Sequence, residues 1–172
     1  MIELPEAPRL VPPTTDVRTS YLVGEQADML VRGSQTSWLV EASRDFDTYV
    51  AERRGIRERW GVPSEVFWWV AGDLYLGSLV LRHRLTDDEG GGHVGYHVVQ
   101  PWQRQGHATA MLGAVLPKAA ALGLDRVLLT VAPGNVASLA VVARHGGVAD
   151  GRNHEGEDRY WVETGRTGTP TA

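Results

Sequence analysis

Three dense runs of β-forming residues in the middle of the chain most constrain what it can fold into. The runs are EVFWWVA, LYLGSLVL and HVGYHVV, at residues 65–71, 74–81 and 93–99. Gly72-Asp73 separates the first two runs, and glycine in first place suits a two-residue type II′ hairpin turn. The polar stretch 86–92 separates the second run from the third. The sequence therefore predicts three consecutive strands in an antiparallel meander.

Helical and strand patterns alternate after these runs. They predict a helix from about Arg104, a strand at 126–131, a helix at 135–144, and two short strands near 147–151 and 159–163. A strand, helix, strand step implies one parallel pair, between the third run and 126–131. Pro117 lies inside the first helix and predicts a kink or a break there. We expect an α/β (α+β) fold with a mixed, mostly antiparallel central sheet and helices on both faces.

The first sixty residues predict two helices after an extended start. A short strand is expected near 9–11, one helix at 14–32 and a second helix at 45–57. The apolar side of the first helix would consist of Tyr21, Leu22, Ala27, Leu30 and Val31. We expect a single domain over residues 1–163. The tail 164–172, rich in Thr, Gly and Pro, is predicted to be disordered.

Composition narrows the functional classes. Hydrophobic residues make up 42% and charged residues 22% of the 172 residues, as in soluble globular proteins. A net charge of −4 disfavours a nucleic-acid partner. The absence of cysteine excludes disulfides, a thiol nucleophile and thiolate metal sites. The N-terminus lacks the pattern of a signal peptide and no run approaches a membrane span, so we expect a cytoplasmic protein without a membrane partner.

The segment VVQPWQRQGHAT, at residues 98–109, carries the clearest functional signal. A strand ends at Val99, Pro101 stops its ladder, and a helix opens near Arg104. A turn with Gly106 at a helix N-terminus presents free backbone N–H groups and the positive end of the helix dipole, which suit a pyrophosphate. Arg104 adds a positive charge for a phosphate oxygen. Neither the GxGxxG nor the GxxxxGK[ST] fingerprint is present.

Two motifs give the chain a specific family resemblance. Gln103-x-x-Gly106-x-Ala108 matches the Q/R-x-x-G-x-G/A signature of the GNAT superfamily of N-acetyltransferases. Asn135-x-x-Ser138, followed by the sequence RHGG, resembles the family's second motif on the next helix. The segments GGHVGY, NVAS, HGGV and RYWV resemble a bacterial subgroup of predicted acetyltransferases. The resemblance implies the GNAT fold, whose sheet splays apart at the acetyl-CoA site.

The resemblance implies that acetyl-CoA, as co-substrate, binds mostly to backbone groups. Val98 and Val99, at the end of the third strand, would hydrogen-bond the pantetheine arm. The pyrophosphate would bind the N–H groups of Arg104, Gln105, Gly106, His107, Ala108 and Thr109. Asn135 and Ser138 would contact the pantetheine and the far end of the cofactor. No metal is expected.

Two histidines of the third strand are candidates for the general base, which must deprotonate an amine before it attacks a thioester. His93, Gly95, His97 and Val99 alternate onto one face of the strand. By resemblance, His93 aligns with the catalytic glutamate of the histone-acetylating branch, so we expect it to be the base. His97 is the second candidate and a water relay the third; an imidazole suits the role near neutral pH. The Cβ atoms of His93 and His97 would lie about 13 Å apart along the strand, which is too far for the two side chains to share a metal ion.

The resemblance also bears on the aromatic residues. Many family members use a tyrosine on the second motif's helix to protonate the leaving thiolate, but Val142 stands at that position here. Tyr96 faces away from His93, so its expected role is packing. Trp38 and Trp60 lie near the two early helices, where the family builds its acceptor pocket.

These inferences predict an acetyl-CoA-dependent N-acetyltransferase. Its acceptor would be the primary amine of a small molecule or a free amino terminus. The alternative is a non-catalytic sensor module with the GNAT fold that binds acyl-CoA. Dimers are usual in the family, so the resemblance also implies a homodimer.

Overall fold

The structure is a computed structural model that describes residues 3–33, 37–86 and 90–165. Its strands are β1 (Arg9–Val11), β2 (Ile56–Arg59), β3 (Val62–Ala71), β4 (Leu74–Arg82), β5 (Val94–Val98), β6 (Arg126–Val131), β7 (Val148–Arg152) and β8 (Asp158–Glu163). Its α-helices are α1 (Arg18–Arg32), α2 (Ser37–Arg44), α3 (Phe46–Arg53), α4 (His107–Ala121) and α5 (Val136–Arg144), with 3₁₀ helices η1 (Thr15–Val17) and η2 (Gln100–Trp102).

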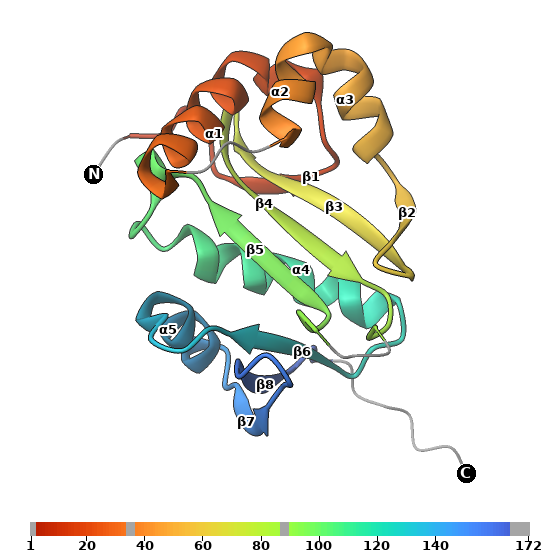
Figure 1. Cartoon of the computed structure of the whole chain (residues 1–172). Coiled ribbons are helices and arrows are strands. Elements are labelled where there is room, and N and C mark those ends of the chain that lie inside the picture. The colour runs from red at the N-terminus through yellow and green to blue at the C-terminus, as the bar shows by residue number, and fades with distance from the viewer. Residues whose placement is uncertain (1–2, 34–36, 87–89, 166–172) are drawn as a thin grey trace.

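The strands form two sheets that lie side by side (Figure 1). The first has the order β1-β3-β4-β5, with β2 also paired to β3, and the second has the order β6-β8-β7. These pairings are all antiparallel, and the predicted meander is confirmed as β3, β4 and β5. The predicted parallel pair is wrong, because β5 and β6 lie in different sheets.

The two sheets touch at the start of β5. The backbone N–H of His93 donates to the Leu128 carbonyl of β6 (2.7 Å), and the Leu128 N–H donates to His93 Nδ1 (2.9 Å). From this contact β5 and β6 diverge toward η2 and α5 (Figure 1). The N-terminus of α4 and the start of α5 therefore lie at the open end of a V-shaped gap between the sheets.

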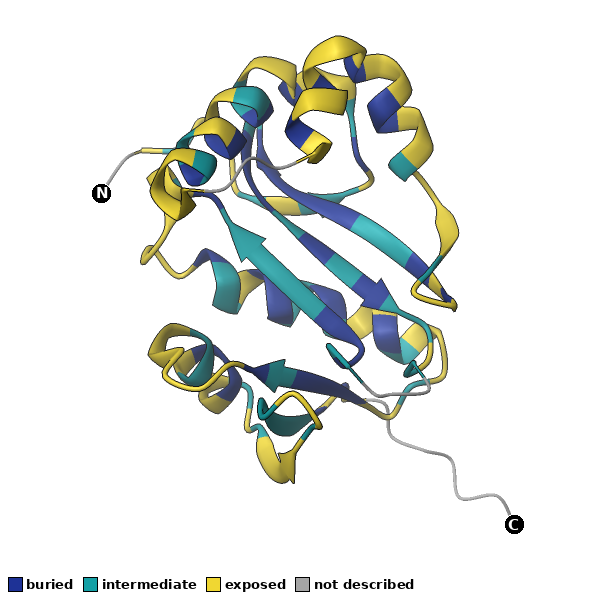
Figure 2. Cartoon of the chain, in the orientation of Figure 1, coloured by how far each residue is buried: buried dark blue, intermediate teal, exposed yellow. Residues whose placement is uncertain are grey.

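Alternating side chains of β3 divide the core between the two faces of the first sheet. Phe67 and Trp69 belong to a cluster with α4 and β6, whereas Trp68 and Val70 belong to a cluster with α1 and α3. Figure 2 shows the same division, with buried strands between helices whose outer faces are exposed. Helices thus cover both faces of the first sheet, as predicted.

Helix α1 buries a different side from the predicted one. Leu30 and Val31 are 72% and 65% exposed, although both were expected in its apolar side. The buried residues of α1 are Tyr21, Gly24, Glu25 and Asp28. Two carboxylates are therefore buried where apolar side chains were predicted, and charges are rarely buried without a partner or a function.

The second predicted helix is shorter than expected. Asp45 caps α3, since its side chain accepts from the Thr48 N–H (3.1 Å), but α3 ends at Arg53. Residues 56–59 instead form β2, because they pair with the start of β3. Helix α2 and strand β2 were not predicted. Strand β2 could not be recognised from its charged sequence, because it forms by pairing with β3.

Helix α4 differs from the prediction at its start. It begins at His107 rather than near Arg104, because Arg104 has a left-handed backbone (φ 62°) that no α-helix accommodates. Of the kink or break predicted at Pro117, the break is absent, because the helix continues to Ala121.

The tail prediction fails at its first residue. The Thr164 N–H donates to the Asp125 carbonyl (2.9 Å) and its hydroxyl to the Leu124 carbonyl (2.7 Å), so this residue is part of the packed structure. Residues 166–172 lie outside the described residues.

Candidate active site

A cavity of about 680 Å³ lies between β5, α4 and α5. Eight of the ten residues predicted to bind the cofactor line it: Val98, Arg104, Gly106, His107, Ala108, Thr109, Asn135 and Ser138. Its volume lies within the range of about 300–1,000 Å³ that is usual for small-molecule sites. We call it the cofactor cavity.

The N-terminus of α4 opens into the cofactor cavity. Gly106, the N-cap residue, has a φ of +86°, and a Cβ built on it would meet nothing within 4 Å. No side chain caps this end of the helix, so the N–H groups of its first turn face the cavity without an intrahelical acceptor. Arg104 and Arg144 bring two guanidinium groups to the same cavity. This end of the cavity fits a pyrophosphate.

His107 adds a neutral donor to this end. Its Nδ1 accepts from the indole N–H of Trp69 (3.2 Å), which places the ring proton on Nε2. Burial lowers the pKa of His107, so the ring is neutral near pH 7. Among the described residues nothing bonds its Nε2.

One backbone carbonyl at the free edge of β5 already has a side-chain partner. Gln103 Nε2 donates to the Val98 carbonyl (2.9 Å), so the first residue of the predicted motif covers the edge that faces the V. Val99 differs from the prediction, because its N–H donates to the Leu76 carbonyl (3.1 Å) and its side chain is buried. Gln105 also departs from it, since it does not line the cavity and its side chain donates to the Pro101 carbonyl.

Asn135 and Ser138 lie at the start of α5. Asn135 is the N-cap residue, and its Oδ1 accepts from the Ser138 N–H (3.1 Å). Its side chain therefore stabilises the helix end as well as lining the cavity.

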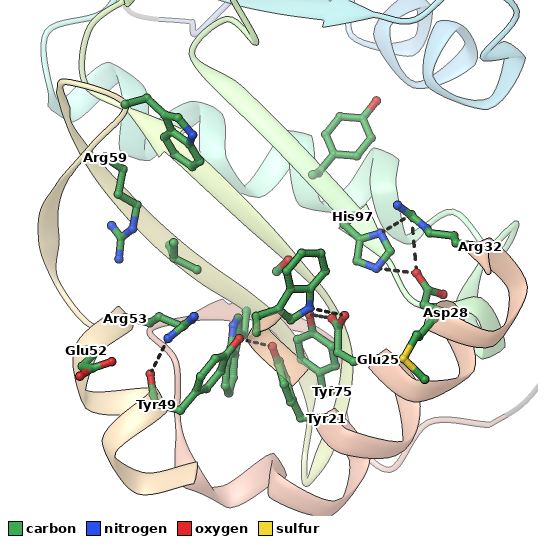
Figure 3. Close-up of a pocket in the computed structure, with 17 residues that line it drawn as sticks. Tyr21, Glu25, Asp28, Arg32, Tyr49, Glu52, Arg53, Arg59, Tyr75 and His97 are labelled. Atoms are coloured by element: carbon green, nitrogen blue, oxygen red, sulfur yellow. Dashed lines mark hydrogen bonds and ion pairs between the residues drawn. The ribbon is translucent and has the colours of Figure 1, made fainter. Parts of the chain in front are cut away.

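A second cavity, of about 740 Å³, lies on the other side of β5. Residues of α1, α2, α3, β2, β3 and β4 line it, among them Trp38 and Trp60 as predicted (Figure 3). Tyr96 and His97 of β5 line both cavities. We call the second one the acceptor cavity, because these two residues are where a molecule in it would meet the cofactor cavity.

His97 lies between two charged residues of α1. Its Nε2 is 2.8 Å from Asp28 Oδ2, and its Nδ1 is 3.2 Å from a guanidinium nitrogen of Arg32 (Figure 3). Asp28 is 5% exposed, and its Oδ1 accepts from the Gln100 N–H (2.7 Å). The side chain of Arg32, in contrast, is 60% exposed. Because arginine can only donate, Nδ1 accepts and the ring proton lies on Nε2. Asp28 Oδ2 lies at ion-pair distance from that nitrogen, although its direction does not make a hydrogen bond.

A glycine permits this arrangement. A Cβ on Gly24 would lie 3.0 Å from a methyl carbon of Val99, so only glycine lets α1 come this close to the end of β5. The close approach brings Asp28, one turn further along α1, to the Gln100 N–H and to His97. Asp28 was not predicted from the sequence. The one feature that could have indicated it is that this acidic residue lies on the same side of the helix as Tyr21 and Gly24.

The position of His93 contradicts its predicted role as general base. The side chain is 5% exposed at the closed end of the V, and His93 lines neither cavity. Its Nδ1 already accepts from the Leu128 N–H. Burial, and secondarily the charge of Arg82, lower the pKa of His93 to about 4, which also makes it a poor proton acceptor. His93 is placed to join the two sheets.

A hydrogen-bonded network of phenols forms the floor of the acceptor cavity. The Tyr75 hydroxyl donates to Glu25 Oε1 (2.9 Å), and the indole of Trp38 donates to Glu25 Oε2 (3.2 Å). The hydroxyls of Tyr21 and Tyr49 hydrogen-bond each other nearby. Burial raises the pKa of Tyr21 and Tyr75, so these phenols stay neutral near pH 7.

A family model described as Acetyltransferase (GNAT) domain matches residues 10–148. The chain belongs to this family. It is an acetyl-CoA-dependent acyltransferase, which agrees with the cofactor cavity and confirms the fold, family and co-substrate that were predicted. No curated protein sequence matches the chain.

Solved structures of other GNAT proteins share the fold. Mycobacterium smegmatis RimJ, in complex with a CoA disulfide, aligns with a TM-score of 0.68 and 22% identity over 91% of this chain and 81% of that chain. A Salmonella typhimurium acetyltransferase that modifies the N-terminal serine of L7/L12 aligns with a TM-score of 0.60 and 16% identity over 90% of this chain and 93% of that chain. The Microcin C7 self-immunity acetyltransferase MccE, in complex with acetyl-CoA and AMP, aligns with a TM-score of 0.59 and 13% identity over 91% of this chain and 92% of that chain.

The proton donor usual in the GNAT family is absent from α5. Val142 is 1% exposed and packs in the core, while its neighbour Val141 lines the cofactor cavity. Tyr96, predicted to serve only in packing, lines both cavities instead. Burial raises the pKa of its phenol, and a side-chain hydrogen bond with Ser138 opposes the rise. Sequence reasoning missed Tyr96 because it looked for a phenol on the helix and not on the strand.

Within the residues that the structure describes, no group of three or more His, Cys, Asp or Glu could hold a metal ion. The same residues include no helix with the length and apolar character needed to span a bilayer.

Proposed function

We propose that the chain transfers the acetyl group of acetyl-CoA to a primary amine bound in the acceptor cavity, with His97 as the general base. The placement of His97 carries this proposal. It borders both cavities, and a buried carboxylate lies 2.8 Å from its Nε2. Of the two histidines weighed from the sequence, it is the one within reach of an acceptor.

The ring nitrogen that faces Arg32 is the one that would take the proton. Nδ1 accepts from the exposed Arg32 guanidinium, which an incoming ammonium group can replace as donor. Proton transfer to Nδ1 leaves a neutral amine with a lone pair, which is the form that attacks a carbonyl carbon. The negative charge of Asp28 then stabilises the imidazolium, and its hydrogen bond with the Gln100 N–H holds the carboxylate in place.

The remaining steps assign a role to Tyr96. Acetyl-CoA, when bound, supplies the thioester, with its pyrophosphate at the start of α4 beside Arg104, His107 and Arg144. As the amine nitrogen bonds to the acetyl carbon, the carbon–sulfur bond breaks and the sulfur takes up a proton from a donor. The nitrogen gives up its second proton as the amide forms, and that proton restores the donor. Tyr96 is protonated at neutral pH and lies between the cavities, so it can donate that proton.

Both predicted acceptor classes remain in the proposal. The Salmonella typhimurium neighbour modifies a protein N-terminus, which supports a free amino terminus. A cavity of about 740 Å³ is also large enough to enclose a small-molecule amine. A homodimer remains part of the proposal as the resemblance implied it.

Release of free thiol from acetyl-CoA tests the proposal, measured with a panel of primary amines at pH 7. Wild type should turn over, and His97→Ala should lower kcat by about 10²-fold with little change in KM for acetyl-CoA. The defect should shrink at high pH, where more of the amine is already neutral. Asp28→Asn should lower kcat by about tenfold and change the pH profile of kcat, since a positioning carboxylate acts through the histidine.

His154→Ala, in an exposed loop, is the matched control and should leave kcat unchanged. Thiol release by His97→Ala at the wild-type rate would overturn the assignment of the base. The sensor alternative predicts tight acyl-CoA binding and no thiol release with any amine.

A further inference from the structure

The acceptor cavity is charged differently at its two ends. Figure 3 shows Glu25, Asp28 and His97 on the side of α1, and Arg53 and Arg59 on the opposite side, near α3 and β2. Aromatic side chains make up much of the remaining lining: Tyr21, Tyr49, Trp60, Trp68 and Tyr75. An acceptor that fills the cavity therefore has one end beside the buried carboxylates of Glu25 and Asp28, where Arg32 pairs with Asp28, and the other end beside Arg53 and Arg59.

Arg59 has no counter-charge among the described residues. It is half-buried, and its one hydrogen bond donates to the Ser64 carbonyl (3.1 Å). No described carboxylate lies within ion-pair distance of it, and Glu52, which also lines this end, is exposed. Burial, and then the charges of Arg53 and Arg57, lower the pKa of Arg59, so its positive charge is energetically unfavourable in the free protein. An anion bound beside Arg59 would remove that cost.

Arg53 is fixed at the same end. Its guanidinium lies 3.4 Å from the centre of the Tyr49 ring and donates to the Tyr49 carbonyl (3.3 Å). Its other nitrogen is 3.3 Å from Glu41, whose side chain is exposed and does not line the cavity. Stacking on an aromatic ring keeps a guanidinium in one orientation while leaving some of its N–H donors available.

Resting on the proposed function, we propose that the acceptor is a small molecule with its primary amine at one end and an anionic group, a carboxylate or a phosphate, at the other. The amine lies beside Asp28 and His97, where an ammonium is attracted before it gives up its proton. The anionic group lies beside Arg53 and Arg59, whose planar donors match the oxygens of either group. The aromatic walls contact an apolar or aromatic body between the two ends.

Four amines of similar size test this proposal: tyramine, para-(aminoethyl)benzoate, tyramine O-phosphate and para-(aminoethyl)benzylamine. They share the amine and the ring and differ in the charge of the far group, and the second and third distinguish a carboxylate from a phosphate. The value of kcat/KM from thiol release should be at least about tenfold higher for an anionic compound than for tyramine, and lowest for the diamine.

Two arginine variants locate the effect. Arg59→Met should reduce the preference for an anionic compound over tyramine to less than about threefold. Arg57→Met removes the same charge from the same strand but lies outside the cavity, so it should keep the wild-type preference. Arg53→Met serves as a second variant if thermal unfolding shows that Arg59→Met is not folded.

The outcomes separate this proposal from the proposed function. Turnover of all four amines with equal kcat/KM, or an unchanged preference in Arg59→Met, would overturn the anionic acceptor and leave acetyl transfer standing. If no compound releases thiol, calorimetric binding of the four compounds decides. Tighter binding of an anionic compound that depends on Arg59 supports the proposal, and equal or absent binding of all four overturns it.

Discussion

The two cavities on either side of β5 are built in different ways. The cofactor cavity depends on main-chain features within one short segment: a carbonyl at a strand edge, a left-handed turn and an uncapped helix start. The acceptor cavity depends on side chains from seven elements, which are spread over residues 21–97. A site built from the backbone can be recognised in the sequence as a motif, because the glycine and the helix start must occur at fixed spacings. A side-chain site of the second kind leaves no spacing to recognise.

The cavities also differ in how they carry charge. The cofactor cavity presents guanidinium groups and helix N–H donors, as a phosphate-rich ligand requires. The acceptor cavity buries two carboxylates, Glu25 and Asp28, together with several phenols. Burying carboxylates is unfavourable without partners. Trp38, Tyr75, His97 and the Gln100 N–H come to them from other elements, and only Arg32, 3.6 Å from Asp28, belongs to the same helix. The acceptor side therefore demands more of the tertiary structure than the cofactor side does.

The largest expected effect tests the backbone character of the cofactor cavity. Gly106→Asp places a negative charge at the start of α4, where the pyrophosphate is expected, and should weaken CoA binding by about 10²-fold or more. Isothermal titration calorimetry with CoA measures it. A left-handed φ is tolerated by Asp and Asn better than by most residues, so the protein should remain folded.

Two controls separate charge from backbone strain in that experiment. Gly106→Asn has the same shape without the charge and should lose much less affinity. Gly123→Asp makes the same substitution at a left-handed glycine beyond the other end of α4, and CoA affinity should be unaffected. Unchanged CoA binding in folded Gly106→Asp would mean that the N-terminus of α4 does not hold the cofactor.

A second prediction concerns His93, which belongs to neither cavity and joins the two sheets. Burial lowers its pKa to about 4 from the ordinary value of 6.5. Between pH 6.5 and 4, His93 is therefore mostly protonated in the unfolded chain and mostly neutral in the folded chain. The free energy of unfolding should fall between pH 6.5 and 4, by on the order of 2 kcal/mol from this residue. Urea unfolding at several pH values in this window measures it.

His93→Asn isolates that contribution. Its side-chain oxygen can accept from the Leu128 N–H as Nδ1 does, but it cannot be protonated in this range. The variant should lose less stability than wild type between pH 6.5 and 4, while His154→Asn, at an exposed position, should behave like wild type. An equal pH dependence in wild type and His93→Asn would show that His93 is not buried as a neutral acceptor.

The contrast between backbone and side chains explains which features could be predicted from the sequence. The meander, the strand at 126–131 and the helix at 135–144 follow from local patterns, and the structure confirms them. Strand β2 and the separation of the two sheets depend on which distant strands pair, which no local pattern records. The same reason accounts for Val99, whose N–H was expected to be free but bonds β4.

The two histidines of the third strand show the limit more sharply. Strand alternation predicts His93 and His97 on one face, but it cannot tell which end of the strand is closed by a second sheet. His93 meets Leu128 and is buried there, whereas His97 meets Asp28 from a helix more than sixty residues earlier. The carboxylate that makes His97 a credible base could not be predicted, because the patterning of α1 favoured Leu30 and Val31 as its buried side.

The smallest expected effect is at Tyr96, where the two cavities meet. Tyr96→Phe keeps the ring that lines both cavities and removes only the hydroxyl. If that hydroxyl protonates the departing sulfur, kcat should fall by about tenfold while KM for acetyl-CoA stays near the wild-type value. Pre-steady-state measurement of thiol release is the direct readout, because it separates acetyl transfer from product release.

Ser138 supplies the control for Tyr96. Ser138, from α5, lowers the pKa of this phenol against the rise caused by burial, so Ser138→Ala should alter kcat in wild type but have almost no further effect in Tyr96→Phe, as residues that act as a unit are not additive. A structural role predicts instead that both variants weaken CoA binding. Unchanged kcat in Tyr96→Phe would mean that the sulfur leaves without help from the protein, which would make the acceptor side alone responsible for moving protons.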